Sequence, residues 1–132
     1  MTAVMEALLN RSSEPRLEAP APDPETLENA FACAARAPDH ALLRPWRYLV
    51  IEGDKALNAL GELFAATCGD DASEKEREKH RKKALRAPMV IVGIACYQPH
   101  PKVPEIEQSM SAAVGMGSVS YTHLTLPTNS LV

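Results

Sequence analysis

The sequence predicts a domain of mixed helical and β structure whose sheet is incomplete. Two short segments, Arg47–Glu52 and Met89–Cys96, are apolar and β-rich, which favours strands, and the first is expected to be buried. The segments around them carry apolar residues at helical spacing or dense charge, which favours helices. The chain of 132 residues is 45% hydrophobic, enough for one domain with a core. Two strands alone are marginally stable in water, so helices or further strands must cover them.

The N-terminal half is expected to contain two helices separated by a linker. Met1–Asn10 has apolar residues at helical spacing and predicts a short amphipathic helix. Glu18–Pro22 contains two prolines and is expected to be extended. Asp23-Pro24-Glu25 is a strong helix start, because Asp caps free N–H groups and Pro suits the first helical position. This helix should run to about Ala35, and Arg36–Trp46 should be irregular.

The C-terminal half is expected to contain three more helices. A helix capped by Asp54 should follow the first strand. Its inward-facing residues are expected to be Leu57, Leu60, Leu63 and Phe64. Ser73–Ala87 alternates acids and bases, which is typical of a solvated helix rather than a basic binding patch. A last helix is expected over Glu105–Gly117.

Composition argues against several classes of function. The net charge of −3 disfavours nucleic acids and membrane surfaces as partners. The longest apolar stretch, Met89–Cys96, is far shorter than the roughly 20 residues that span a bilayer. Met1–Asn10 carries Glu6 and no basic segment, so a secretory signal is not expected. The three cysteines lack metal-ligand spacing, so we expect no metal site and a reduced, cytoplasmic setting. Two of them, Cys33 and Cys96, are expected to fill core positions.

The last residues differ in kind from the rest of the chain. Val119–Thr128 carries no charged residue, ends the helical pattern, and matches residue by residue the translation of a transposase-type sequencing adapter. The adapter bases just before this stretch complete a serine codon, which agrees with Ser118. After it, a variable index would encode residues 129–131, and the constant sequence that follows would encode Val132. We therefore expect residues 118–132 to be a non-native tail. The alternative is a natural polar C-terminal segment that matches by coincidence.

A first group of polar residues follows the first predicted helix. Asn10-Arg-Ser-Ser13, with Arg16 close behind, combines the planar donors of arginine with hydroxyl groups. Such donors suit a phosphate dianion. Taken alone, a polar turn with an arginine is more often simply solvated.

Two further groups lie later in the chain. Arg36-Ala-Pro-Asp-His40 is followed by Arg44-Pro45-Trp46. This group could form a site, or it could be a helix stop and loop in which Asp39 and His40 make local caps. Lys102-Val-Pro104 leads into Glu107-Gln108 and is a weak signal by itself.

Together, in this order and spacing, these groups resemble the flavin-dependent nitroreductase family, and most closely its compact subgroup of NAD(P)H nitroreductases. The resemblance covers essentially Met1–Gly117, and Arg36–His40 before Pro45-Trp46 is its most specific part. The other matching motifs are Leu9-Asn-Arg-Ser-Ser13, Arg16-Leu17, Val50-Ile-Glu-Gly53, Arg86-Ala-Pro88, Lys102-Val-Pro104, Glu107-Gln108 and Met110-Ser111.

The resemblance implies an α+β fold with a central antiparallel sheet flanked by helices. Residues 1–117 would be the N-terminal part of that domain, a truncated form with about two strands of the sheet. It also implies a homodimer that binds FMN non-covalently at the subunit interface. Arg11, Ser12 and Ser13 would hold the phosphate and ribityl chain of FMN, and Arg36 and His40 would reach the same flavin from the other subunit. Ser12 stands where the family often has a second Arg, and Pro15 also departs from the family pattern.

The implied activity is hydride transfer from NAD(P)H through flavin N5 to a nitroaromatic or quinone-like small-molecule acceptor, in a ping-pong scheme. Because the cofactor does the chemistry, no catalytic side chain is expected. The chain as written would lack part of the FMN site and is expected to be inactive. Three alternatives stay open: a flavin enzyme of the same fold with another acceptor, a non-catalytic flavin- or nucleotide-binding module, and a helical interaction domain without a ligand.

Overall fold

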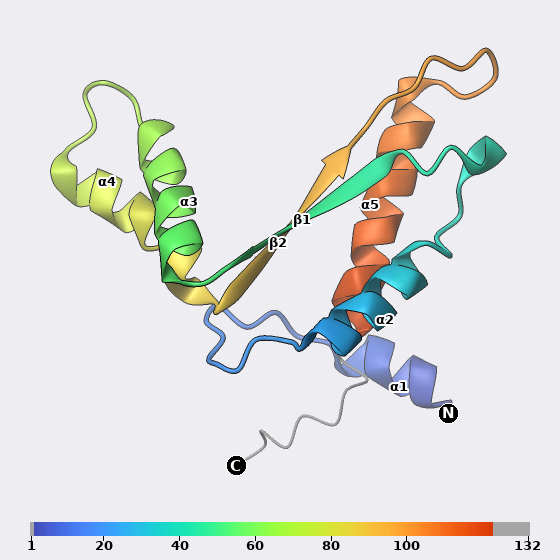
Figure 1. Cartoon of the computed structure of the whole chain (residues 1–132), viewed down its shortest axis with the longest axis horizontal. Helices are drawn as coiled ribbons and strands as arrows, with labels where there is room; N and C mark the ends of the chain where they lie inside the picture. The colour runs from blue at the N-terminus through green and yellow to red at the C-terminus, as the bar shows by residue number, and fades with distance from the viewer. Residues whose placement is uncertain (1, 123–132) are drawn as a thin grey trace. The chain divides into compact units, whose positions relative to one another are not determined.

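The computed structural model describes residues 2–122 (Figure 1). The elements in chain order are α1 (Ala3–Asn10), α2 (Pro24–Ala34), the 3-10 helix η1 (His40–Leu42), β1 (Trp46–Glu52), α3 (Asp54–Ala66), α4 (Glu74–Arg81), the 3-10 helix η2 (Ala84–Arg86), β2 (Met89–Ala95) and α5 (Glu105–Thr122). The two strands pair with each other in an antiparallel ribbon. This order confirms the predicted α+β class with two strands.

The chain forms two compact units, which we describe separately. Unit 1 contains the described residues of Met1–Ser13, Asp23–Tyr48 and Gly93–Val132. Unit 2 contains Glu14–Pro22 and Leu49–Val92. The start of β1 and the end of β2 therefore belong to unit 1, and the rest of the ribbon belongs to unit 2.

In unit 1, α2 packs against α5, and the start of β1 lies in the same core. The expected helix start is confirmed, because the side chain of Asp23 accepts a hydrogen bond from the main-chain N–H of Thr26 at 2.7 Å. The buried residues of this core include Ala30, Ala34, Trp46 and Val103. Its centre is therefore built on small helical side chains around one large aromatic ring.

Tyr48 lies between α2 and α5 in this unit. Its ring stacks on Phe31 with centroids 5.0 Å apart. Its hydroxyl oxygen is buried and has no hydrogen-bond partner in the part of the chain that the structure describes. Burial also raises the pKa of Tyr48. A Cβ atom at Gly115 would lie only 2.8 Å from this oxygen, so α5 can approach Tyr48 only because residue 115 has no side chain.

In unit 2, α3 packs against α4 and η2. Gly53, with φ of 82°, occupies the N-cap position, and Asp54 lies in the first turn rather than at the cap as expected. The buried stripe of α3 consists of Leu57, Gly61 and Ala65. Leu63 is 65% exposed, so its predicted inward orientation is wrong. The face of α3 that contacts α4 is centred on Gly61 instead of on the predicted leucines, and there the backbones of the two helices approach closely.

The charged segment forms a solvated helix, as predicted, but a shorter one. α4 has no buried residue and starts with a capping box between Ser73 and Glu76. Arg81 forms salt bridges with three carboxylates: its guanidinium lies 2.9 Å from Glu62, 2.6 Å from Glu74 and 3.3 Å from Glu78. Regular helix ends at Arg81 instead of Ala87, because the next turn tightens into η2 and buries Ala84 near α3.

The two strands are more exposed than expected. Leu49 is 50% exposed and Ile94 is 43% exposed. Along the start of β1, buried Trp46 alternates with exposed Arg47, half-buried Tyr48 and exposed Leu49. This alternation shows a sheet covered on one face only, whereas an apolar composition alone had suggested burial on both.

At the C-terminal end, α5 continues to Thr122, beyond the expected end of the helical pattern at Gly117. Val119, the first residue of the adapter-like segment, is buried in unit 1. Residues 123–132 of the expected tail lie outside the described part of the chain. Within residues 2–122, no helix combines the length and apolar character needed to cross a membrane.

Replacing Gly61 by alanine should destabilise unit 2. A Cβ atom there would lie 2.8 Å from the main-chain oxygen of Arg81, so the helices must separate. We expect Gly61→Ala to lower the free energy of unfolding by about 1–3 kcal/mol in urea denaturation. Gly117→Ala is the matched control, because nothing lies within 4 Å of its added Cβ. There the better helix propensity of alanine should raise the free energy of unfolding by up to about 1 kcal/mol. Equal effects at both sites would contradict the close contact.

Acid should weaken α4. The main-chain N–H and hydroxyl of Ser73 donate to the Glu76 carboxylate and hold the pKa of Glu76 below its ordinary value of 4.5. The resulting stabilisation is complete above about pH 4.5 and is lost as the pH falls through the lowered pKa. Carbon chemical shifts of α4 followed from neutral to acid pH should report this loss of helix. In Glu76→Gln the loss should be shallower, and an unchanged acid response would count against the capping box as its source.

Candidate functional site

The loop between α2 and β1 carries His40 in a strained backbone. The chain is extended at Asp39, and three non-glycine residues then have positive φ: 61° at Ala41, 52° at Leu42 and 47° at Arg44. Such angles cost of the order of 1–3 kcal/mol each and persist only where the surroundings impose them. Asp39 imposes one of them, because its carboxylate accepts a hydrogen bond from the main-chain N–H of Arg44 at 2.6 Å. The local cap that we considered for this segment is absent at η1, since the side chain of Asp39 makes no capping hydrogen bond there and bonds the chain beyond it instead.

A second constraint comes from the chain that precedes α5. The side-chain amide of Gln98 donates to the main-chain oxygen of Leu43 at 2.9 Å. Gln108, only 1% exposed, holds Gln98 in turn: its Oε1 accepts from the main-chain N–H of Gln98 at 2.9 Å. Its Nε2 donates to the carbonyls of Gln98 and Val103 at 2.8 and 3.2 Å. Gln108 thus joins the start of α5 to the η1 loop through Gln98, and its buried amide is hydrogen-bonded at both its oxygen and its nitrogen.

His40 itself contacts α5. Its Nδ1 lies 2.8 Å from Oε2 of Glu107, and the two side chains are 54% and 45% exposed. Glu107 belonged to the weakest of the three sequence groups, and its pairing with His40 was not foreseen. No sequence pattern shows this contact, because the two residues are 67 positions apart.

The polar group after α1 is also partly ordered by its own contacts. The guanidinium of Arg11 donates to the hydroxyl oxygen of Ser13 at 2.8 Å. Arg11, Ser12 and Ser13 are all exposed. A guanidinium has five N–H donors, so most of them stay available beside two hydroxyl groups. This donor set fits a phosphate dianion. Arg16 is exposed too, but it belongs to unit 2.

The structure does not gather the five predicted cofactor-binding residues into one site within one chain. Arg36 is exposed just after α2, and His40 is exposed at the start of η1. Figure 1 shows the end of α1 and η1 at opposite ends of α5. A single chain therefore presents two separate groups of candidate residues, Arg11–Ser13 at one end of α5 and His40 at the other.

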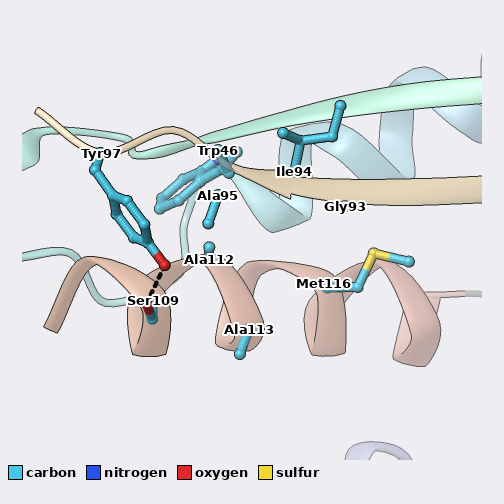
Figure 2. A pocket seen from close by; sticks show the side chains of 9 residues that line it. All are labelled: Trp46, Gly93, Ile94, Ala95, Tyr97, Ser109, Ala112, Ala113 and Met116. Atoms are coloured by element: carbon cyan, nitrogen blue, oxygen red, sulfur yellow. Dashed lines mark hydrogen bonds between the residues drawn. The ribbon is translucent and has the colours of Figure 1, made fainter. Parts of the chain in front are cut away.

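A shallow groove of about 330 Å³ lies elsewhere in unit 1, between the end of β2 and α5. It is lined by Trp46, Gly93, Ile94, Ala95, Tyr97, Ser109, Ala112, Ala113 and Met116 (Figure 2). None of these residues carries a charge at neutral pH, and none was predicted as a site residue. Figure 2 shows the Tyr97 hydroxyl reaching Ser109 on α5, where the two oxygens are 2.7 Å apart. The groove suits apolar groups and has no charged partner for a phosphate among these residues.

The cysteines differ from the expectation in one respect. Cys33 is exposed on α2, so its predicted core position is wrong, and Cys96 is partly buried. The buried face of α2 is set instead by Ala30 and Ala34. Among the described residues, no group of three or more His, Cys, Asp or Glu side chains is placed to hold a metal ion.

Comparisons with known proteins agree on one family. A family model described as the nitroreductase family matches residues 8–119. A curated protein from Escherichia coli named "Putative NAD(P)H nitroreductase YdjA" is 41% identical over 110 residues, which are 82% of this chain and 59% of that protein. A similarly named protein from Haemophilus influenzae is 44% identical over 107 residues, covering 80% of this chain and 58% of that protein. The chain thus spans somewhat more than half the length of these relatives.

Solved structures share the fold at lower sequence identity. A nitroreductase family protein from Clostridium novyi superimposes with a TM-score of 0.68 at 22% identity, covering 93% of this chain and 64% of that one. A nitroreductase-like protein from Bacillus cereus gives a TM-score of 0.70 at 20% identity, covering 92% and 64%. These similarities concern the fold alone.

Proposed function

Because this chain belongs to the nitroreductase family, we propose that residues 1–117 form the N-terminal part of an FMN-dependent oxidoreductase, and that residues 118–132 are an adapter-encoded tail. The enzyme would transfer hydride from NAD(P)H to a nitroaromatic or quinone-like acceptor. The observation that carries the proposal is the exposure of all five candidate residues. Their guanidinium, hydroxyl and imidazole groups are therefore accessible to a ligand.

Arg11, Ser12 and Ser13 would bind the phosphate of FMN. The guanidinium of Arg11 is the strongest donor group available to a phosphate in this segment, because its hydrogen bonds are charge-assisted. The contact between Arg11 and Ser13 limits the freedom of both side chains and so reduces the entropy lost on binding.

His40 and Arg36 would serve the rest of the cofactor. The η1 loop holds His40 at a fixed point of unit 1, so its ring needs little reorganisation to meet a ligand. Bound FMN would supply the hydride chemistry in two alternating half-reactions. The side chains of this chain would bind and orient, and no acid or base among them is required.

A second copy of the chain would bring the two groups of candidate residues together. They lie at opposite ends of α5 in one chain, and a two-fold axis across α5 places one end of a helix beside the other end of its mate. Three apolar side chains on α5, spaced four residues apart, offer a surface for this contact: Ile106 is 66% exposed, Met110 62% and Val114 48%. We propose this stripe as part of the homodimer interface.

A chimera tests the activity. Residues 1–117 would be joined to the C-terminal part of the E. coli relative, with the 132-residue chain as comparison. We expect the chimera to bind FMN and to oxidise NAD(P)H anaerobically with a nitroaromatic acceptor, and the 132-residue chain to do neither. Arg11→Ala should weaken FMN binding about tenfold or more, since a hydrogen bond to a charged group contributes about 1.5–3 kcal/mol. Lys75→Ala removes an exposed charge from α4 and should leave affinity unchanged.

Each other result has a clear meaning. A folded chimera without FMN would refute the cofactor assignment. FMN binding without NAD(P)H oxidation would identify a non-catalytic flavin-binding module, and oxidation with other acceptors only would identify a different enzyme of the same fold.

Met110→Glu tests the interface. A carboxylate in the centre of the α5 stripe would have to be desolvated on dimerisation, so the chimera should sediment as a monomer and lose FMN in parallel. Leu63→Glu is the matched control, because Leu63 is 65% exposed but belongs to unit 2. A Met110→Glu protein that remains dimeric would place the interface elsewhere.

A further inference from the structure

His40 has one ring nitrogen engaged and one available. Nδ1 lies 2.8 Å from the carboxylate of Glu107. An ionised carboxylate only accepts hydrogen bonds, so Nδ1 must carry the proton of this contact. Within residues 2–122 the other nitrogen, Nε2, has no partner, and the side chain is 54% exposed. In the neutral ring, Nε2 is then an acceptor with a free lone pair.

We propose that Glu107 is a positioning residue that fixes the tautomer and orientation of His40, so that His40 offers a hydrogen-bond acceptor to the bound cofactor. The inference rests on the proposed role of His40 as a cofactor-binding residue. It assigns Glu107 a function that acts through His40, with no contact of its own to the ligand.

The support of Glu107 is rigid, which a positioning role requires. Glu107 precedes the buried Gln108, whose amide is fully engaged by Gln98 and Val103. On the other side, the loop that carries His40 is fixed by Asp39 and by the contact of Gln98 with Leu43. Both partners of the 2.8 Å contact are therefore attached to immobilised backbone.

The strain in the loop points the same way. Ala41 and Leu42 directly follow His40 with φ of 61° and 52°. Leu42 is 77% exposed, so burial of its own side chain does not compensate for this strain. In this conformation His40 lies against α5, where its ring contacts Glu107.

The tautomer decides which part of a flavin nucleotide His40 can serve. A neutral ring with a free Nε2 accepts hydrogen bonds, so it matches an N–H or O–H group, such as a ring imide or a ribityl hydroxyl. It does not match a phosphate dianion, which itself only accepts. Phosphate binding would then fall to the guanidinium and hydroxyls of Arg11–Ser13, and the two groups would divide the cofactor between them.

The tautomer can be measured without any cofactor. Long-range ¹H–¹⁵N spectra of the 132-residue chain at mildly alkaline pH distinguish the two neutral forms, with His40→Gln assigning the signals. We expect the Nδ1–H form to dominate at His40. Glu107→Ala should shift the ring toward the Nε2–H form that a free histidine prefers. Glu107→Gln should restore much of the Nδ1–H form, since its amide oxygen can still accept. Glu105→Ala is the matched control on the same helical turn and should change nothing.

Three results would overturn the proposal. If the tautomer is unchanged in Glu107→Ala, the contact is only structural. The same conclusion follows if the Arg44 amide signal is lost together with the Nδ1–H form, because the loop itself would then have opened. A doubly protonated ring in the unsubstituted chain would make His40 a donor instead of an acceptor.

FMN binding to the chimera supplies the second readout. Glu107→Ala and His40→Gln should each weaken FMN binding by about threefold to tenfold, the effect of one hydrogen bond, and Glu105→Ala should have no effect. If the tautomer depends on Glu107 but neither variant alters FMN affinity, the role of His40 toward the cofactor is wrong and the inference with it. A chimera that binds no FMN refutes the proposed function, while the spectra still report on Glu107 independently.

Discussion

The buried amide of Gln108 is the interaction on which the organisation of unit 1 depends. One side chain satisfies both main-chain groups of Gln98 and the carbonyl of Val103, in surroundings from which water is excluded. An unsatisfied buried amide would cost about 1–3 kcal/mol for each group, so the three hydrogen bonds hold as a set. They determine where α5 begins, and Glu107 follows from that position. The chain from β2 to α5 has no regular structure, yet this residue makes it a rigid part of the fold.

The elements of the fold were predictable where the signals are local. Asp23 before Pro24 predicts a helix start, and the structure shows the Asp23 cap. Alternating acids and bases predict a solvated α4, and the structure shows no buried residue in it. The inward face of α3 was not predictable, because a leucine such as Leu63 has the same helical spacing as its neighbours. Only the close backbone contact at Gly61 decides which face is buried.

The candidate site was predictable only in its residue types. The motifs around Arg11 and His40 indicate a nucleotide cofactor through their resemblance to a family. Their separation along α5, the positive φ angles after His40 and the pairing with Glu107 all depend on tertiary contacts. A positive φ at a glycine can be anticipated, whereas at Ala41, Leu42 and Arg44 no local preference indicates it. A motif therefore indicates which ligand its residues could bind, whereas the fold determines which of these residues lie close enough to act together.

The contact between Gly115 and the phenol of Tyr48 sets the rotational phase of α5. The space beside the phenol oxygen admits a hydrogen atom and no carbon, so glycine is the residue of α5 that fits there. Sliding the helix by one position would turn it by about 100° and bring Val114 or Met116 against the ring. One phase is thus selected sterically. In that phase Ile106 and Met110 face outward while Glu107 meets His40, so a single missing side chain keeps the apolar and the polar faces of this helix from exchanging places.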